Sequence, residues 1–144
     1  MPVRPIKYKY GLQNRYPGMR IRDEVIWDEY VKKHPHAFNF TWYNVPLGDP
    51  FPDPDKKILA LANGGYEVGQ WRIDVLAEGD DGLVVIEVKP NADSRALGEA
   101  LAYTALLKKE WGISAPVVPV VLTDKMSPIL EQAAKLMGVV VIVP

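Results

Sequence analysis

The chain has 144 residues, of which 48% are hydrophobic and none is cysteine. This length suits one compact domain with its own core, and the lack of cysteine excludes disulfides, thiolate metal sites and thiol nucleophiles. No apolar run approaches the roughly 20 residues of a membrane span, and the start MPVRPIKYKY lacks the apolar centre of a signal peptide. We therefore expect a soluble cytoplasmic protein with no membrane partner, encoded by a cellular or a phage genome.

The net charge of -1 hides an uneven distribution of charge along the chain. Residues 1–22 hold six cations and no acid, and tyrosines at positions 8, 10 and 16 are interleaved with them. Cations bind phosphates and tyrosine can stack on exposed bases, which predicts a nucleic-acid-binding arm over residues 1–18, followed by a domain over 19–144. A solvated tail is the alternative interpretation. The expected DNA contacts in this region are Arg4, Lys7, Lys9, Arg15 and Arg20.

The first half of the domain begins with a helix predicted over residues 19–33, which ends before His34-Pro35 because proline restricts the residue before it. In residues 37–44, aromatic side chains at alternate positions predict a half-buried strand. Residues 46–57 are rich in proline and aspartate and predict a loop, either a substrate-facing lid or a surface insertion. Residues 58–62 are expected to form a short strand or a helical turn.

Residues 71–90, WRIDVLAEGDDGLVVIEVKP, predict two apolar strands joined by a tight turn at Gly79–Gly82. A symmetric hairpin with this turn places Asp74 directly opposite Glu87, with Cβ atoms about 5 Å apart, and alternation puts Lys89 on the same face as Glu87. Two carboxylates at that distance repel each other, so they either share a proton or bind a hard divalent cation. The hairpin therefore predicts a metal site.

The C-terminal part predicts a helix over residues 93–111, a strand over 116–122, a helix over 128–137 and a strand over 138–144. Alternating strands and helices of this kind are connected by right-handed parallel crossovers. Together with the antiparallel hairpin they indicate a mixed sheet.

The pattern of Asp74, twelve intervening residues and Glu87-Val88-Lys89 resembles the PD-(D/E)xK nuclease superfamily. The resemblance implies an α/β fold, a restriction-endonuclease-like single domain with a mixed central sheet flanked by helices and an α-β-β-β-α-β core. Ile73 stands where the family name has proline. Pro52-Asp53 and Pro54-Asp55 carry the expected letters, but their proline-rich segment could not pair with the Glu87 strand.

The resemblance also implies a chemical role for each residue of this motif. Mg²⁺ or Mn²⁺ would be held by Asp74, Glu87 and the backbone carbonyl of Val88. Lys89 would orient or deprotonate the attacking water, or stabilise the negative charge that develops on the phosphate. These three roles of the lysine stay open at this point.

Many members of the family carry one more acid on the first helix. The candidates here are Asp23, Glu24, Asp28 and Glu29. We expect Glu24 to join the catalytic group, with Glu29 in reserve, and the other interpretation of Glu24 is an exposed acid in the first turn of the helix.

Relatives of the exonuclease branch have a helical glutamine followed four residues later by tyrosine. Glu99 and Tyr103 keep that spacing, although the substitution of glutamine by glutamate weakens the match and Tyr103 could equally be a core residue. Arg95, one turn before Glu99, is placed to reach a phosphate.

These residues predict a metal-dependent phosphodiesterase, specifically a Mg²⁺-dependent DNA endonuclease of DNA repair, recombination or the processing of phage and mobile-element DNA. The alternative is a catalytically inactive nuclease-like fold that serves as a DNA-binding or structural assembly module. A third interpretation is an unrelated α/β ligand-binding domain. The choices between DNA and RNA, and between a monomer and a homodimer, stay open.

Overall fold

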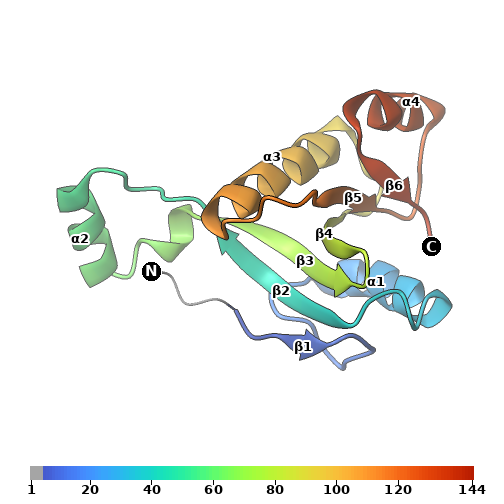
Figure 1. Ribbon diagram of the computed structural model, residues 1–144, viewed down its shortest axis with the longest axis horizontal. Helices are drawn as coiled ribbons and strands as arrows, with labels where there is room; N and C mark the ends of the chain where they lie inside the picture. The colour runs from blue at the N-terminus through green and yellow to red at the C-terminus, as the bar shows by residue number, and fades with distance from the viewer. Residues whose placement is uncertain (1–4) are drawn as a thin grey trace.

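Six strands form one mixed sheet in the order β1-β2-β3-β4-β5-β6 (Figure 1). The computed structural model describes residues 5–144, apart from the side chain of Glu67. The strands are β1 (Tyr8–Lys9), β2 (Phe40–Leu47), β3 (Trp71–Gly79), β4 (Gly82–Val88), β5 (Val118–Leu122) and β6 (Val140–Ile142). The helices are α1 (Ile21–Lys33), α2 (Pro54–Ala62), α3 (Ser94–Glu110), α4 (Pro128–Met137) and the short 3₁₀ helix η1 (Glu67–Gly69).

The predicted fold class is confirmed by the order and direction of the elements. The chain passes through α1, then the antiparallel strands β2, β3 and β4, then α3 and β5, which is the expected α-β-β-β-α-β core. Strands β4, β5 and β6 are parallel, as the crossovers required. In the hairpin, Gly79 pairs with Gly82 and Val75 pairs with Ile86. This is the predicted register.

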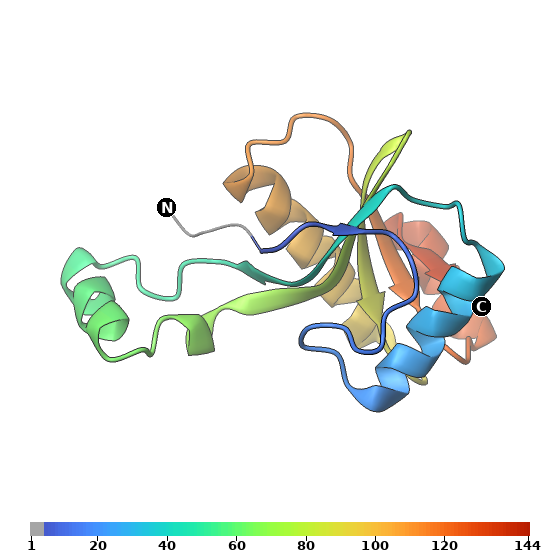
Figure 2. The ribbon, with the colours of Figure 1, turned by 90° about the horizontal axis from the view of Figure 1, so that it is seen from below.

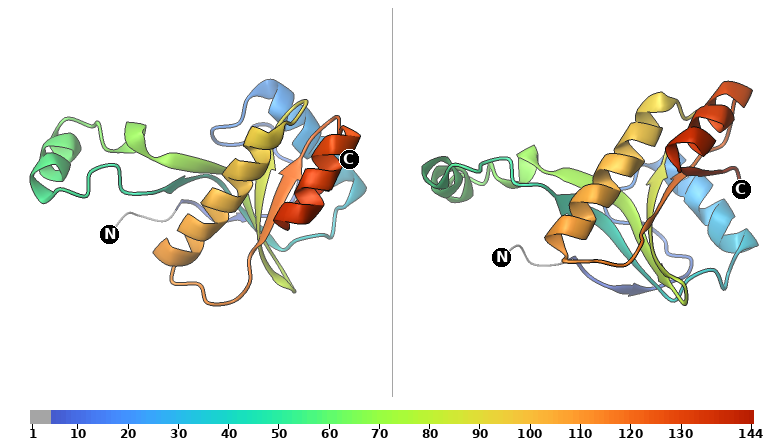
Figure 3. Two further views of the ribbon diagram at one scale, coloured as in Figure 1. Left: turned by 90° about the horizontal axis from the view of Figure 1, so that it is seen from above. Right: turned by 45° about the horizontal axis from the view of Figure 1, so that its top comes forward.

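Helices cover both faces of the sheet, with α1 on one face and α3 and α4 on the other (Figure 3). The core under α1 contains Trp27 and Ile86, and the core under α3 contains Val85 and Leu107. Neighbouring residues of β4 thus point into different layers, so both of its faces are buried and its sequence is almost entirely apolar. Val25 of α1 lies outside this core and is 62% exposed.

The predicted helix ends are set by local capping groups. The Asp93 carboxylate accepts a hydrogen bond from the Arg95 N–H at the start of α3, and the Ser127 hydroxyl accepts one from the Leu130 N–H at the start of α4. Gly138 has φ 72° and ends α4 in the left-handed conformation that glycine adopts most readily. These signals are local, so both helices lie where the sequence predicted them.

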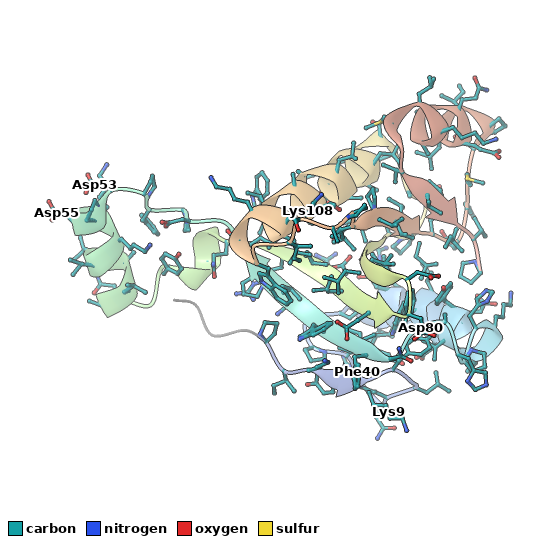
Figure 4. The ribbon with its side chains drawn as sticks, in the orientation of Figure 1. Lys9, Phe40, Asp53, Asp55, Asp80 and Lys108 are labelled. Carbon is teal, nitrogen blue, oxygen red and sulfur yellow. The ribbon has the colours of Figure 1, made fainter. Side chains whose placement is uncertain are left out.

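Residues 48–70 project from the body of the protein as an arm that carries α2 and η1 (Figure 2). The prediction of a loop over 46–57 is therefore wrong at both ends, because β2 runs to Leu47 and α2 begins at Pro54. Asp53 caps this helix by accepting a hydrogen bond from the Asp55 N–H. Both aspartates lie at the far end of the arm (Figure 4), so neither Pro-Asp pair belongs to the Glu87 strand.

The described part of the predicted N-terminal arm, residues 5–18, packs on the domain. Strand β1 pairs with β2, and Tyr10 and Tyr16 are buried in the same core as Trp27. These two rings are therefore not free to stack on bases, and no boundary separates residue 18 from the domain. Arg4 lies outside the described residues.

The structure also bears on the membrane prediction. In the part of the chain from residue 5 onward, no helix is both long and apolar enough to span a bilayer.

Candidate active site

Asp74 and Glu87 meet where β3 begins and β4 ends. Asp74 donates a backbone hydrogen bond to Oε1 of Glu87 (3.3 Å), and Val88 donates one to Oδ2 of Asp74 (2.9 Å). Each carboxylate is thus anchored on the backbone of the opposite strand. Glu87 is 1% exposed, so its side chain is almost fully removed from water. The hairpin register brings the two acids together as the sequence predicted.

The electrostatics of this pair disfavour two negative charges. Burial raises the pKa of Glu87 well above its ordinary value, and the charge of Asp74 and a hydrogen bond between the two carboxyls raise it further. Burial also raises the pKa of Asp74, although the Val88 N–H and the Lys89 ammonium favour its charged form. A carboxyl pair of this kind either keeps a proton, so that only one negative charge remains, or binds a cation that compensates both charges.

Lys89 follows the pair at the end of β4 and contacts α3 across the site. Its Nζ lies 3.6 Å from Oε2 of Glu99, and Nε of Arg95 lies 3.4 Å from Oε1 of the same glutamate. Glu99 therefore forms an ion pair with both Lys89 and Arg95. Lys89, Arg95 and Glu99 line a pocket of about 280 Å³ at the N-terminal end of α3, together with Asn91 and Asp93.

Tyr103 lies one turn after Glu99 and belongs to the same group of side chains. Burial raises its pKa to about 12, and the charges of Glu99, Glu87 and Asp74 contribute. Its ring also packs partly against the core under α3. Glu99 and Tyr103 thus lie within electrostatic range of the carboxylate pair.

Glu24, the acid that we expected to join the site, is engaged elsewhere. It is 7% exposed, and its Oε1 accepts hydrogen bonds from Nε of Arg15 (2.9 Å) and from the Tyr16 N–H (3.2 Å). Burial alone would raise its pKa, but these two donors outweigh burial and lower it. The structure therefore does not bring Glu24 to the carboxylate pair, and uses it to hold the N-terminal segment on α1.

The other acids of α1 have different positions. Asp28 accepts a hydrogen bond from the Tyr16 hydroxyl (2.5 Å), and Glu29, the reserve candidate, pairs with Lys33 on the helix surface (3.8 Å). Asp23 is the acid of α1 whose charge acts on the pair, since it adds to the effect of burial in raising the pKa of Asp74. The sequence offered Asp23 as a candidate but contained no signal that separated it from Glu24.

The donor set of the site fits a magnesium ion. Across residues 5–144, no group of three or more histidine, cysteine or acidic side chains could together hold a metal. Mg²⁺ commonly binds through one or two carboxylates and keeps several waters, so it does not need such a group. Asp74 and Glu87 supply two adjacent carboxylates whose mutual repulsion a divalent cation would relieve.

The cations expected to bind DNA occupy three places. Lys7 and Lys9 lie on β1, and Lys7 pairs with Glu78 (3.6 Å). Arg15 is bound to Glu24, and Arg20 precedes the first residue of α1. Within the described residues, neither Lys9 nor Arg20 has an ion-pair partner, and Figure 4 shows Lys9 at the outer edge of the molecule.

Comparison with known proteins adds little. No protein-family model and no curated protein matches the sequence. A solved EndoMS-dsDNA2 complex is similar in structure, with 17% sequence identity and a TM-score of 0.48 over 90% of this chain and 47% of the other. The present chain therefore spans about half the length of that protein. A likeness of this strength carries no functional argument.

Proposed function

We propose that this chain is a Mg²⁺-dependent deoxyribonuclease that hydrolyses phosphodiester bonds inside DNA strands. The observation that supports the proposal is the buried Asp74–Glu87 pair, with Lys89 two residues after Glu87, directly beyond the end of β4. A buried acid with a raised pKa beside a second acid costs stability unless a cation compensates its charge, and such groups are frequent at functional sites. DNA repair, recombination and the processing of phage or mobile-element DNA are the settings that we propose for this activity.

In this proposal, Asp74, Glu87 and the backbone carbonyl of Val88 would hold the ion. When bound, Mg²⁺ would polarise the phosphate and make the attacking water more acidic. The chain's own contribution is to hold two carboxylates between two strands, where backbone donors from Asp74 and Val88 fix their positions before substrate arrives. Such preorganisation avoids the cost of arranging charges during the reaction.

Lys89 would act on the water or on the developing negative charge. Its ammonium is held beside the pair by Glu99, so it is positioned in the absence of DNA. A substrate phosphate would compete with Glu99 for this lysine. Asp23 would supply the further acid from α1, in place of the expected Glu24, because its charge reaches Asp74.

DNA binding would use cations on both sides of the carboxylate pair. Arg95 is 86% exposed on the α3 side, and Arg20 lies at the start of α1, near Asp23. Guanidinium groups suit phosphate because their donors form a planar fork. Lys7, Lys9 and Arg15 are the remaining proposed contacts among the described residues.

A second candidate function is a catalytically inactive nuclease-like module for DNA binding or assembly. The observation that favours it is α2, whose aliphatic residues Ile58, Leu59 and Leu61 are 67%, 64% and 57% exposed at the end of the arm. Exposed aliphatic groups on a projecting helix are typical of a surface that contacts another protein. An intact Asp74, Glu87 and Lys89 argues against loss of activity.

The two candidates are separated by nicking of supercoiled plasmid in Mg²⁺ and in EDTA. The proposed nuclease nicks in Mg²⁺ alone, and Asp74→Asn removes nicking. The matched control is Asp81→Asn, the same chemical change in the exposed hairpin turn, which should leave nicking intact. Nicking that is absent in every condition, or equal in Asp74→Asn and wild type, would refute the proposal and favour the module.

A further inference from the structure

Trp71 is an exposed aromatic residue at the beginning of the strand that carries Asp74. Its side chain is 54% exposed, whereas Trp27 and Trp42 are 0% and 8% exposed. Two residues, Arg72 and Ile73, separate Trp71 from Asp74, so the three steps of extended chain between them span roughly 10 Å along β3. An indole is a large rigid ring with an apolar face, so an exposed indole offers a flat surface for stacking.

The indole has a defined support on the catalytic side of the sheet. Its ring packs against Tyr103 of α3, with centroids 5.8 Å apart and planes tilted by 45°. Tyr103 lies one turn after Glu99, and Glu99 holds Lys89 at 3.6 Å. Trp71 thus packs on a tyrosine whose helix also carries Glu99, the ion-pair partner of Lys89. The ring is fixed in place while more than half of its surface faces water.

The chemistry of an indole selects among the parts of a DNA substrate. Phosphates are bound by cations, which the site already has in Lys89 and Arg95. An indole instead stacks on a nucleobase. Bases in continuous duplex are stacked on their neighbours, so only an unpaired or extruded base can reach such a ring.

The distances fit a base close to the reacting phosphate. Successive nucleotides rise about 3.4 Å along one strand of a duplex, so roughly 10 Å corresponds to about three nucleotides. A strand whose phosphate lies at Asp74 and Glu87 would thus place a base from the same neighbourhood on Trp71. Continuous duplex offers no base for this contact.

We propose that Trp71 is a stacking platform for an unpaired DNA base within about three nucleotides of the scissile phosphate, so that the site selects single-stranded, flapped or mismatched DNA over continuous duplex. The inference rests on the proposed nuclease function and adds its substrate class. Trp71 is a specificity-determining residue in this scheme, with no part in the reaction itself.

The experiment measures binding without cleavage. Asp74→Asn protein is titrated with a single-stranded oligonucleotide, a flapped duplex and a blunt duplex in Mg²⁺, with and without a second substitution, Trp71→Ala or Trp71→Phe. Stacking contributes about 1 to 3 kcal/mol per base, so Trp71→Ala should weaken binding of the first two substrates by about 5- to 150-fold. Blunt-duplex affinity should change by less than about 2-fold, and Trp71→Phe should keep most of the preference.

Ile58→Ala is the control for loss of an exposed apolar side chain, because Ile58 is 67% exposed on the arm and should not affect any DNA affinity. DNA should also quench tryptophan fluorescence in Asp74→Asn protein, and Trp71→Phe should remove most of that quenching. Thermal melting of each variant checks that the fold is kept.

The outcomes separate this proposal from the proposed activity. Equal loss of affinity for all three substrates, no loss for any, or no DNA binding at all would overturn the platform. An unchanged DNA affinity would point to Trp71 as a contact for a protein partner. Absence of cleavage by wild-type protein would overturn the nuclease function, while the substrate preference in binding would still decide the role of Trp71.

Discussion

Two buried glutamates, Glu24 and Glu87, lie in surroundings of opposite character. Glu24 is 7% exposed and receives hydrogen bonds from a guanidinium and a backbone N–H, which lower its pKa in spite of burial. Glu87 is 1% exposed and faces a second carboxylate, so burial and the charge of Asp74 both raise its pKa. The first acid is stable as an anion inside the fold, and the second is not.

This difference shows that burial of an acid does not by itself mark a functional site. The partners decide the outcome, because donors compensate one charge and a like charge opposes the other. A protein retains an uncompensated buried acid at a cost in stability, which a bound cation can remove. Glu24 is therefore explained by the fold alone, whereas Glu87 calls for a ligand.

The largest expected effect is on cleavage when the Asp74–Glu87 pair is changed. Asp74→Asn and Glu87→Gln should each remove DNA nicking, because either change takes away a charge that would hold the metal. Nicking is measured at saturating Mg²⁺ beside Glu24→Gln, whose folded protein should still cut. Full activity in either variant of the pair would show that the two acids are not the catalytic group.

A smaller loss is expected from Lys89→Ala. An electrostatic or general acid-base role of the ammonium corresponds to about 10² to 10⁴-fold in turnover. Metal-dependent DNA binding should persist, because Asp74 and Glu87 are untouched. Single-turnover cleavage and Mg²⁺ titration are measured on the same protein. If Mg²⁺ affinity falls and the single-turnover rate does not, Lys89 acts through the metal site instead.

Replacement of glutamate by glutamine should have opposite effects on stability at positions 24 and 87. Glu24→Gln loses a charge-assisted hydrogen bond and should lower the free energy of unfolding by about 1.5 to 3 kcal/mol. Glu87→Gln removes repulsion and should leave it unchanged or raise it in EDTA. Urea unfolding of both variants provides the measurement. A Glu87→Gln protein as destabilised as Glu24→Gln would contradict the assignment of strain to the pair.

Glu24 and Glu87 should also make the stability of the protein depend on pH in opposite directions. A raised folded-state pKa gives a stabilising contribution that is present below the unfolded-state value and is lost as the pH rises through the folded-state value. For Glu87 in EDTA, stability should thus fall as the pH rises above the ordinary glutamate range, and Glu87→Gln should remove this fall. Saturating Mg²⁺ should suppress it as well.

For Glu24 the sign is reversed, because its folded-state pKa is lowered. Its contribution is present above the unfolded-state pKa and is lost as the pH falls through the folded-state value. Urea midpoints measured from acid to neutral pH should show this loss in wild type and not in Glu24→Gln. Identical profiles in the two proteins would mean that Arg15 and Tyr16 do not stabilise the anion.

The smallest expected effect is on DNA binding when a single arginine is replaced by alanine. Arg15 is already bound to Glu24, so Arg15→Ala should change DNA binding less than Arg20→Ala or Arg95→Ala. Each phosphate contact contributes about 0.9 to the log-log salt slope on duplex DNA. A salt titration of Asp74→Asn protein should therefore show a slope flatter by about 0.9 for Arg20→Ala. Equal slopes for all three variants would place the phosphate contacts elsewhere, with Lys9 the next residue to change.

A protein truncated at its N-terminus would be a poor test of the cations in that segment. Tyr10 and Tyr16 are buried in the core under α1, so removal of residues 1–18 would open that core. A loss of DNA binding in the truncated protein would then report unfolding as much as lost cations.

The sequence by itself determined the features that depend on near neighbours in the chain. The turn at Gly79–Gly82 set the register that places Asp74 against Glu87, and capping by Asp93 and Ser127 set the starts of two helices. Such signals act over a few residues, so they are readable without knowledge of the fold.

Only the tertiary structure decided which residues of α1 and of the N-terminal segment reach the site. Asp23 and Glu24 are adjacent in sequence, yet the charge of Asp23 acts on Asp74 whereas Glu24 is bound to Arg15. Packing of Tyr10 and Tyr16 in the core under α1 likewise fixed the expected arm on the domain and removed these two rings from contact with bases. These outcomes depend on contacts between segments distant in sequence, which no local pattern records.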